Sequence, residues 1–317
     1  MMTPVRKAVI TAAGRGTRQY PATNTVQKEL FPLVDVDGYA KPTLQIIAEE
    51  AVASGIQEIC VVANTTNAEP IRQHFHGLTE AQRAGQFAGK DWAWALSDAL
   101  DDLARRLTVV VQAAQEGYGH AVYQAREWVG DEPCVVLLGD HVYRSHTDER
   151  CARQVIAAYE QYDCPVSSVA RTPESLITRL GTVAGRPLGG TPPVYEVAAM
   201  TEKPAVEEAR ARLRTPGLAD GEYLCFFGIH VFPPAIFDCL EHLLRHDIRR
   251  KGEFQLTSAQ ALLFERGRYL VSEVQGERYD MGVPEGLIET QIALALDSPY
   301  RKQAIALLSH APGGIGD

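Results

Sequence analysis

The 317-residue chain lacks any Cys-x-x-Cys pair and any other close grouping of cysteines. Zinc sites need closely spaced ligands, and small secreted domains need a dense cysteine framework. Several of the cysteines lie inside apolar runs, so we expect buried free thiols instead of disulfides or a zinc site. The six cysteines are Cys60, Cys134, Cys151, Cys164, Cys225 and Cys239.

The chain also lacks a long hydrophobic run. Nothing in it approaches the roughly 20 apolar residues of a membrane-spanning helix, and no long apolar segment follows the basic residues near the N-terminus. The composition, 45% hydrophobic and 22% charged residues, is typical of a soluble globular protein, and we expect a cytoplasmic one. The net charge of −9 argues against nucleic acids and anionic membranes as partners. A polyanionic ligand would therefore need a locally basic pocket.

Short apolar runs alternate with helix-like stretches, which predicts an α/β protein with a mostly parallel sheet. Most of the runs are unbroken Val, Ile and Leu, as in strands that are buried on both faces. The expected strands cover residues 8–12, 59–63, 107–112, 134–138, 166–171, 195–200 and 224–231. The expected helices cover residues 43–54, 120–129, 148–162, 234–246, 258–265 and 284–296.

Three stretches fall outside this alternation. Residues 67–106, with Trp92 and Trp94, predict an irregular helical insertion that packs over the sheet edge. The Pro- and Gly-rich residues 186–193 predict a hairpin-type loop, and residues 214–221 a second loop. We expect the tail, residues 313–317, to fray.

The most informative segment follows the first strand. Gly14 and Gly16 remove the Cβ atoms that would keep a phosphate from the backbone, and successive N–H groups in such a turn bind anions. Arg18 adds a planar guanidinium that can bind two phosphate oxygens, and Lys28 adds a single mobile positive charge. A dinucleotide-binding turn would have a third glycine where Gln19 stands, and a P-loop string is absent from the chain. Taken alone, Gly14-Arg15-Gly16 would by default be an ordinary strand-to-helix turn with surface cations, and only the longer pattern favours phosphate binding.

Other polar groups follow later strands. Gln112 ends a strand and precedes Gly117-Tyr118-Gly119-His120, so its amide could pair with the edge of a base. Taken alone, these residues are better explained as a polar strand end followed by a helix N-terminus. Asp140 follows the strand over residues 134–138, at the edge where open α/β sheets bind ligands. A carboxylate there favours a bound cation, although a helix cap or turn is the ordinary alternative. Glu202-Lys203-Pro204 follows the strand that ends at Met200.

Together these segments resemble the sugar-1-phosphate nucleotidylyltransferases, and within them most closely the bacterial UTP:glucose-1-phosphate uridylyltransferases. The resemblance extends in the expected order over nearly the whole chain. Its signature, GxGTRxxPxTxxxxKExxP, is formed here by Gly14, Gly16, Thr17, Arg18, Pro21, Thr23, Lys28, Glu29 and Pro32.

The resemblance implies a Rossmann-like three-layer α/β/α nucleotidyltransferase fold with a mostly parallel mixed central sheet. It implies one domain over residues 1–317, with nucleotide binding in residues 1–150 and sugar-phosphate binding in residues 151–317. The implied reaction is Mg²⁺-dependent: UTP and a sugar 1-phosphate, with glucose 1-phosphate the leading candidate, give a UDP-sugar and pyrophosphate by in-line attack. Family members are commonly dimers or tetramers, so we expect a homo-oligomer.

The resemblance also implies roles for individual residues. The implied catalytic residues are Arg18, Lys28, Asp140 and Lys203, and the implied metal ligands are Asp140 and Asp280. The implied nucleotide-binding residues are Ala12, Ala13, Gly14, Arg15, Gly16, Thr17, Arg18, Lys28, Gln112, Gly117 and Gly119. The implied sugar-phosphate-binding residues are His141, Gly181, Glu202, Lys203 and Glu253; Glu253 could equally cap the following helix.

The chain departs from the uridylyltransferase pattern at several positions. Gln27 and Gly139 replace prolines, and Gly139 makes the strand end look like that of the thymidylyltransferases. Leu180 replaces the aromatic residue of the sugar loop, and Thr182 replaces an aliphatic residue. The substrates are therefore less certain than the reaction. Alternatives are dTTP, a modified sugar or cyclitol phosphate, a non-catalytic nucleotide-sugar sensor, and a nicotinamide oxidoreductase, which Gln19 disfavours.

Overall fold

A nine-stranded sheet runs through the structure, a computed structural model that describes residues 3–309. The expected fraying of residues 313–317 falls outside the described residues. The sheet order is β5 (Leu107–Gln112), β4 (Glu58–Asn64), β1 (Lys7–Ala12), β6 (Cys134–Leu138), β11 (Glu222–Phe232), β8 (Val166–Pro173), β12 (Leu270–Glu273), β10 (Val194–Glu202) and β9 (Gly181–Gly189).

The sheet is mixed, as expected. Strands β5, β4, β1 and β6 are parallel to one another, and β12 is parallel to β8. Strands β10 and β11 run antiparallel to all of their partners. Seven of the nine strands therefore point the same way, and their carboxyl ends meet along one edge of the sheet.

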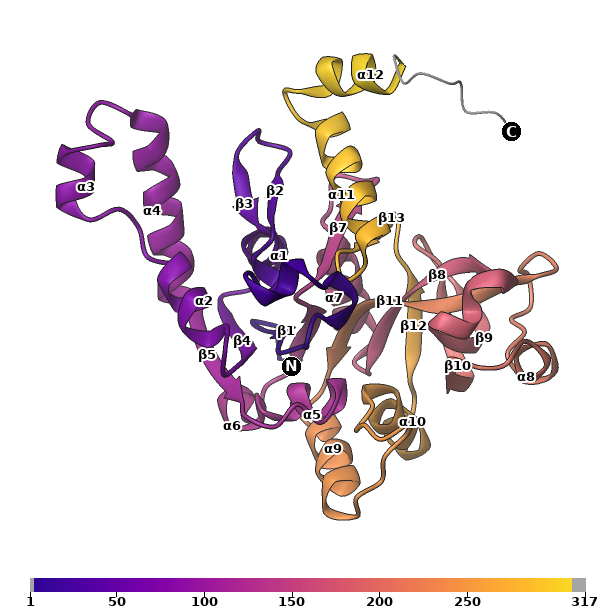
Figure 1. Ribbon diagram of the computed structural model, residues 1–317. Helices are drawn as coiled ribbons and strands as arrows, with labels where there is room; N and C mark the ends of the chain where they lie inside the picture. Colours follow the sequence, from indigo (N-terminus) through magenta and orange to yellow (C-terminus); the bar gives the residue numbers. More distant parts are fainter. Residues whose placement is uncertain (1–2, 310–317) are drawn as a thin grey trace.

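Helices cover both faces of this sheet (Figure 1), which gives the three-layer α/β/α arrangement that we expected. Within β1, Ile10 packs with one layer and Val9 with the other, because side chains of a strand alternate between faces. The first layer holds α1 (Thr43–Ala53), α2 (Ala68–His74) and α7 (Cys151–Tyr162). The second layer holds α5 (Tyr118–Tyr123), α6 (Arg126–Val129), α9 (Ala235–Arg245) and α10 (Leu256–Arg266).

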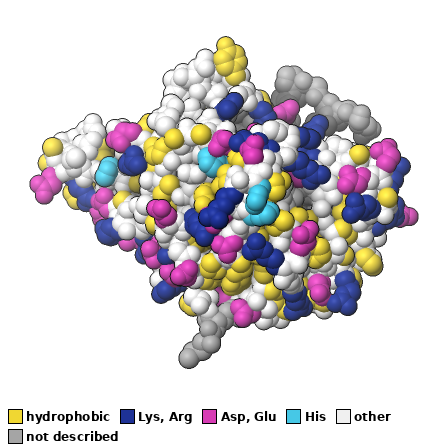
Figure 2. All heavy atoms as spheres, turned by 90° about the horizontal axis from the view of Figure 1, so that it is seen from below, with side chains coloured by type: hydrophobic (Ala, Val, Ile, Leu, Met, Phe, Trp, Pro, Cys, Tyr) yellow, Lys and Arg dark blue, Asp and Glu magenta, His cyan; other side chains and the backbone are white. Residues whose placement is uncertain are grey.

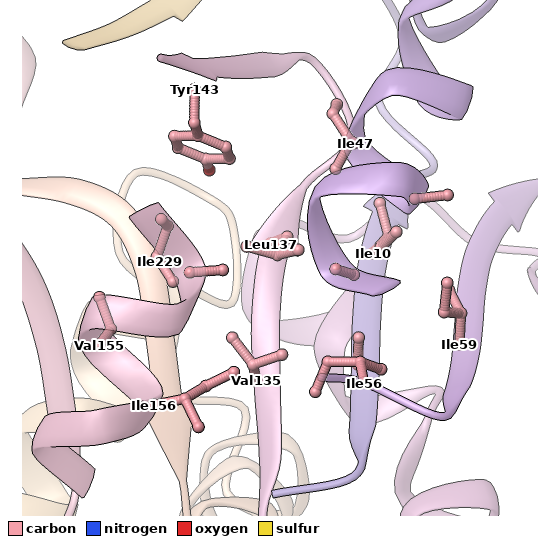
Figure 3. Packing of buried hydrophobic residues seen from close by; sticks show 14 of the residues in the cluster. Ile10, Ile47, Ile56, Ile59, Val135, Leu137, Tyr143, Val155, Ile156 and Ile229 are labelled. Carbon is pink, nitrogen blue, oxygen red and sulfur yellow. The ribbon is translucent and has the colours of Figure 1, made fainter. Parts of the chain in front are cut away.

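The core of the first layer is aliphatic. Figure 3 shows Ile10, Val135 and Leu137 of the parallel strands facing Ile47 of α1, with Val155 and Ile156 of α7 alongside. Unbroken β-branched runs therefore formed strands buried on both faces, as predicted.

One expected helix is divided. Residues 120–129 form the end of α5, a turn, and α6. The N–H of Gln124 is shared between the carbonyls of His120 and Ala121, which tightens and ends α5.

The insertion over residues 67–106 is helical, as expected, with α3 (Glu80–Ala84) and α4 (Asp91–Arg106) following α2. Helices α2 and α4 contact the edge strand β5, and α3 projects away from the sheet (Figure 1). Packing over the sheet edge thus describes only the base of this segment. Near its tip, Trp92 stacks on Tyr39 with ring centroids 5.9 Å apart.

Several elements were not expected, among them strands β9 and β12 of the main sheet. The short unexpected elements are strands β2 (Pro32–Val34), β3 (Ala40–Pro42), β7 (His141–Ser145) and β13 (Gly276–Asp280), and 3-10 helices at Thr17–Gln19, Ala22–Asn24, Lys28–Leu30 and Glu174–Arg179. Helices α8 (Val206–Arg212) and α12 (Arg301–Ser309) were not expected either, whereas α11 (Pro284–Asp297) matches the helix expected over residues 284–296. Strands β9 and β10 form the predicted hairpin, and residues 214–221 form the predicted loop.

No helix within residues 3–309 has both the length and the apolar character needed to cross a membrane. On the face seen in Figure 2, Lys and Arg side chains are interspersed with Asp and Glu.

Candidate active site

The glycine-rich loop leaves the carboxyl end of β1 and enters a 3-10 helix at Thr17. Gly16 has φ 64°, and a Cβ there would lie 2.8 Å from Cγ2 of Thr23. The Thr23 hydroxyl donates to the carbonyl of Gly16 at 3.1 Å. The Thr of the motif therefore packs against the loop, and the position requires glycine.

Gln19 stands where a dinucleotide fold would have its third glycine. Its side chain is buried, and its amide donates to the carbonyl of Met281 at 2.9 Å. The phosphate-loop candidate is thereby tied to the segment that follows β13. Gln19, which disfavours a dinucleotide-binding turn, therefore fixes the loop against the segment after β13.

The loop opens on a cavity of about 710 Å³. Its lining joins segments from the whole chain: Thr11, Ala13, Gly14, Arg15, Gly16, Thr17, Arg18, Lys28, Glu29, Gln112, Gln115, Gly117, Tyr118, Ala121, Leu138, Asp140, Gly252, Glu253 and Gly282. Most of the expected nucleotide-binding residues are among them. Ala12 is buried behind the loop, and Gly119 donates its N–H to the carbonyl of Phe254, so neither lines the cavity.

Three acids and two cations meet at or beside this cavity. Lys28 forms an ion pair with Asp140, and its Nζ lies 3.4 Å from Oε1 of Glu29. Nη1 of Arg18 lies 3.6 Å from Oδ2 of Asp280. These contacts join the phosphate loop, the end of β6 and the end of β13 into one charged cluster.

Burial and pairing act in opposite directions on these groups. Burial tends to lower the pKa of Lys28, but Asp140 and Glu29 outweigh it and raise that pKa. Burial tends to raise the pKa of Asp140, but Lys28, His141 and Arg18 lower it to about 2. Burial raises the pKa of Glu29 to about 7, although Lys28 opposes the shift. At neutral pH, Lys28 is therefore a cation and Asp140 an anion.

The candidate metal ligands come together because β7 and β13 pair. Asp280 lies opposite His141 in that ladder, and the N–H of Met281 donates to the carbonyl of Asp140 at 2.8 Å. The ligand atoms of Asp140, His141 and Asp280 all lie within 4.8 Å of one another. Two carboxylates at this separation fit a hard divalent cation that takes its remaining oxygens from phosphate and water.

Gly282 faces this cluster and was not predicted as a site residue. A Cβ at this position would lie 2.5 Å from Nη2 of Arg18 and 2.8 Å from a carboxylate oxygen of both Asp140 and Asp280. The N–H of Gly282 also donates to Oδ1 of Asp280 at 2.8 Å. The glycine therefore allows the backbone to approach the charged groups closely.

The side chain of His141 is 12% exposed, and this partial burial lowers the pKa of its imidazole to about 4. Its Nε2 lies 3.8 Å from Oδ1 of Asp280. The neighbouring strand β11 makes room for the ring at Gly228, where φ is 102° and a Cβ would lie 2.9 Å from Nδ1 of His141. The ring is therefore neutral above about pH 5 and can accept as well as donate a hydrogen bond.

The other end of the cavity carries the candidate base-binding residues. Nε2 of Gln112 lies 2.9 Å from Nδ1 of His120 and 3.4 Å from the carbonyl of Gly117. These contacts hold the Gln112 amide at the end of β5. His120 is thus positioned to orient the amide.

The expected sugar-phosphate residues form a second group beside the lining of this cavity. Gly181 of β9 lies opposite Glu202 of β10, and a Cβ on Gly181 would lie 2.9 Å from Oε2 of Glu202. Thr257 of α10 donates to the same oxygen at 2.6 Å. Nζ of Lys203 lies 3.6 Å from Oε1 of Glu202, and the Lys203 side chain is 45% exposed, so it is accessible to an anion from solvent.

Glu253 lies elsewhere. It lines the large cavity, and its Oε2 accepts from Nε2 of Gln255 at 3.0 Å. Helix α10 begins after Gln255 and has no side-chain cap, so the helix-capping alternative for Glu253 is wrong. The loop places Glu253 beside Gly117. A Cβ added at Gly117 would lie 2.8 Å from the Cβ of Glu253.

Comparison with known proteins agrees with this geometry. A family model described as nucleotidyl transferase matches residues 7–295. The chain belongs to the nucleotidyl transferase family. The resemblance read from the loop motif is thereby confirmed, and the chain is a nucleotidyltransferase enzyme.

This nucleotidyl transferase is 35% identical over 306 residues to a UTP--glucose-1-phosphate uridylyltransferase of Streptococcus pyogenes, covering 95% of this chain and 92% of the relative. It is also 35% identical to the enzyme of the same name from Bacillus subtilis (strain 168), covering 97% of each. Among solved structures, a UDP-glucose pyrophosphorylase complexed with UDP-glucose matches with a TM-score of 0.74 and 26% identity, covering 94% and 99%. A UTP-bound UGPase from Acinetobacter baumannii matches with a TM-score of 0.78 and 25% identity, covering 98% and 100%.

One departure from the family pattern has a structural explanation in this nucleotidyl transferase. The N–H of Gly139 donates to the carbonyl of Thr11 at 2.9 Å, and a Cβ at Gly139 would lie 2.6 Å from that oxygen. A proline at this position would have no N–H to donate. A backbone hydrogen bond therefore joins the end of β6 directly to β1.

Proposed function

We propose that this nucleotidyl transferase moves the uridylyl group of UTP to a sugar 1-phosphate, with glucose 1-phosphate the leading substrate. The observation that carries the proposal is the charged cluster of Arg18, Lys28, Asp140 and Asp280, which lies at one end of a cavity that begins at the glycine-rich loop. The names of the relatives support the choice of UTP and glucose 1-phosphate.

The cavity supports binding of a triphosphate at its loop end. Loop N–H groups from Gly14 to Thr17, together with Arg18, would hold the phosphates, and the Gln112 amide would pair with the uracil edge. The volume of about 710 Å³ lies within the range typical of small-molecule sites.

Asp140 and Asp280 would hold Mg²⁺, since their oxygens lie close enough to share one ion. The bound ion would screen the charge of the phosphates during transfer. Lys28 now neutralises Asp140, and it would be released toward the α-phosphate when a divalent cation takes its place beside the carboxylate. Lys28 would then face the charge that builds on the α-phosphoryl oxygens.

The sugar phosphate would lie between Asp140 and the group formed by Glu202 and Lys203. Lys203 would bind its phosphate, and Glu202 would accept hydrogen bonds from sugar hydroxyls. An oxygen of the sugar phosphate forms a bond to the α-phosphorus of UTP, and the bond from that phosphorus to the bridging oxygen of pyrophosphate breaks. The attacking oxygen is already ionised, so the step needs no general base.

The decisive experiment measures pyrophosphate release from UTP, Mg²⁺ and glucose 1-phosphate. We expect release that depends on all three, with UDP-glucose as the second product. A panel of dTTP and other nucleotides against several sugar 1-phosphates then ranks the substrates. Binding of UTP or UDP-glucose without pyrophosphate release from any pair would favour the sensor and contradict the proposal.

A further inference from the structure

Tyr118 lines the large cavity but belongs to none of the groups described above. It follows Gly117, whose φ of 118° turns the chain into helix α5. Its ring packs against the buried cluster beneath α5, α9 and α10. Its hydroxyl is buried and has no hydrogen-bond partner among residues 3–309.

Buried polar atoms without a partner are uncommon in folded proteins, and here they gather at one place. Six such side-chain atoms occur in the described residues. Four of the six belong to Tyr118, His141, Glu29 and Gln27, which lie at or beside Lys28 and Asp140. The concentration of unsatisfied groups marks a place where a bound molecule completes the hydrogen bonds.

The electrostatic surroundings make Tyr118 a donor. Burial, and then the charges of Asp140 and Glu202, raise the pKa of its phenol, so the hydroxyl keeps its proton. An O–H group in the field of two carboxylates can offer its proton to a ligand oxygen. Asp140 belongs to the candidate metal site and Glu202 to the candidate sugar group, so the Tyr118 hydroxyl lies near both groups.

We propose that the Tyr118 hydroxyl donates a hydrogen bond to an oxygen of the bound sugar 1-phosphate and thereby contributes to the choice of acceptor substrate. The inference rests on the proposed function. The acceptor is an oxygen of the sugar 1-phosphate, from either its phosphate or a ring hydroxyl. Uracil recognition remains with Gln112, so UTP binding does not depend on this hydroxyl.

The test compares Tyr118→Phe with the wild type in the pyrophosphate-release assay. Phenylalanine keeps the packed ring and removes only the O–H group. We expect the KM for glucose 1-phosphate to rise about 10- to 100-fold if the acceptor is the charged phosphate, and about 2- to 10-fold if it is a hydroxyl. The KM for UTP and the melting temperature should stay at the wild-type values.

Deoxy analogues separate the two acceptors. If a ring hydroxyl accepts, the wild type and Tyr118→Phe become equal on the one deoxyglucose 1-phosphate that lacks it. If the phosphate accepts, the ratio between the two enzymes is the same for every analogue. Tyr123→Phe is the matched control, because Tyr123 lies on the same helix but lines a different cavity beside Arg126.

Wild-type kinetics of Tyr118→Phe on every sugar phosphate would overturn the inference and leave the proposed function intact. An equal rise of both KM values would also overturn it, since that pattern indicates a general distortion of the site. A wild type that releases no pyrophosphate from any pair would instead contradict the proposed function, and the inference would fall with it.

Discussion

At the scale of single residues, Asp140 carries the strongest prediction. Its pKa of about 2 keeps the carboxylate ionised at any working pH, opposite Lys28. Asp140→Asn removes that charge without changing the shape of the side chain. We expect Mg²⁺-dependent pyrophosphate release to fall on the order of 10² to 10³-fold while the circular dichroism spectrum is unchanged.

Asp238→Asn provides the control for Asp140→Asn, since Asp238 is an exposed acid that pairs with Arg126 on α6. It should retain wild-type turnover. An active Asp140→Asn enzyme would show that the metal assignment is wrong.

Thr257 supports the second residue-scale prediction, because its hydroxyl fixes Glu202 at 2.6 Å. Thr257→Val keeps the branched shape but removes the donor. We expect the KM for the sugar 1-phosphate to rise about 2- to 10-fold, because one hydrogen bond typically changes binding by that factor. The KM for UTP should change little. Thr257→Ser keeps the hydroxyl and should restore most of the affinity; a serine variant as weak as the valine variant would argue against this role.

At the scale of elements, the N–H of Gly139 joins the end of β6 to the carbonyl of Thr11 in β1. A Cβ there would lie 2.6 Å from the backbone oxygen of Thr11, which cannot move without disturbing β1. We expect Gly139→Ala to cost about 1–3 kcal/mol of unfolding free energy and to lower turnover, because Asp140 is displaced. Urea unfolding and the pyrophosphate assay measure the two effects.

Gly267→Ala is the control for Gly139→Ala, because nothing lies within 4 Å of a Cβ at Gly267. Its unfolding free energy should stay close to that of the wild type. Equal stability of the two alanine variants would contradict the packing argument.

Strand β11 contributes a dependence of stability on pH. His230 is buried beside Ser167, and burial, with a smaller effect of His141, lowers its pKa from 6.5 to about 3. Between those pH values the unfolded chain binds more protons at this residue than the folded protein does. Stability is therefore fully present above about pH 6.5 and falls as the pH falls, by up to about 1.4 kcal/mol per pH unit.

Urea unfolding of the wild type and His230→Gln at pH 5 to 8 measures this contribution. The pKa of His141 is lowered as well, and that of Glu29 is raised, so the wild type combines contributions of both signs and the difference between the two proteins reports His230. The variant should show a shallower slope, reduced by about one proton. Parallel slopes would show that His230 does not titrate as its burial implies.

At the scale of the whole molecule, the sequence predicted the sheet better than the site. The apolar runs around Ile10, Val61 and Val135 are long enough to identify buried strands from composition alone. Strands β7 and β13 are short and largely polar, so no periodicity distinguishes them from loops. Their pairing nevertheless places Asp280 opposite His141, a contact between residues far apart in the chain.

The family motif predicted individual site residues but not the residues that contact and orient them. Gln19, Thr257 and Gly282 act through tertiary contacts with Met281, Glu202 and the acidic pair. Each is an ordinary residue in its local sequence. Only the three-dimensional arrangement shows that Gln19 fixes the loop and that Gly282 lets the backbone approach the charges.

The last prediction follows from how the cavity is built. Its lining includes residues 13–18, five residues between Gln112 and Ala121, residues 252–253, and Gly282, so a bound nucleotide would contact segments that are far apart in sequence. A ligand that binds only the folded state stabilises it by mass action, about 2.7 kcal/mol at 100 times its Kd. For a chain of this size we expect UTP with Mg²⁺ to raise the melting temperature by roughly 5–10 °C. Chelation of the metal should remove much of the shift, because Asp140 and Asp280 then face the phosphates without a cation between them.

NAD should give no shift, since Gln19 occupies the position of the glycine that a dinucleotide-binding turn needs. Stabilisation by NAD but not by UTP would contradict the assignment of this cavity to a nucleoside triphosphate.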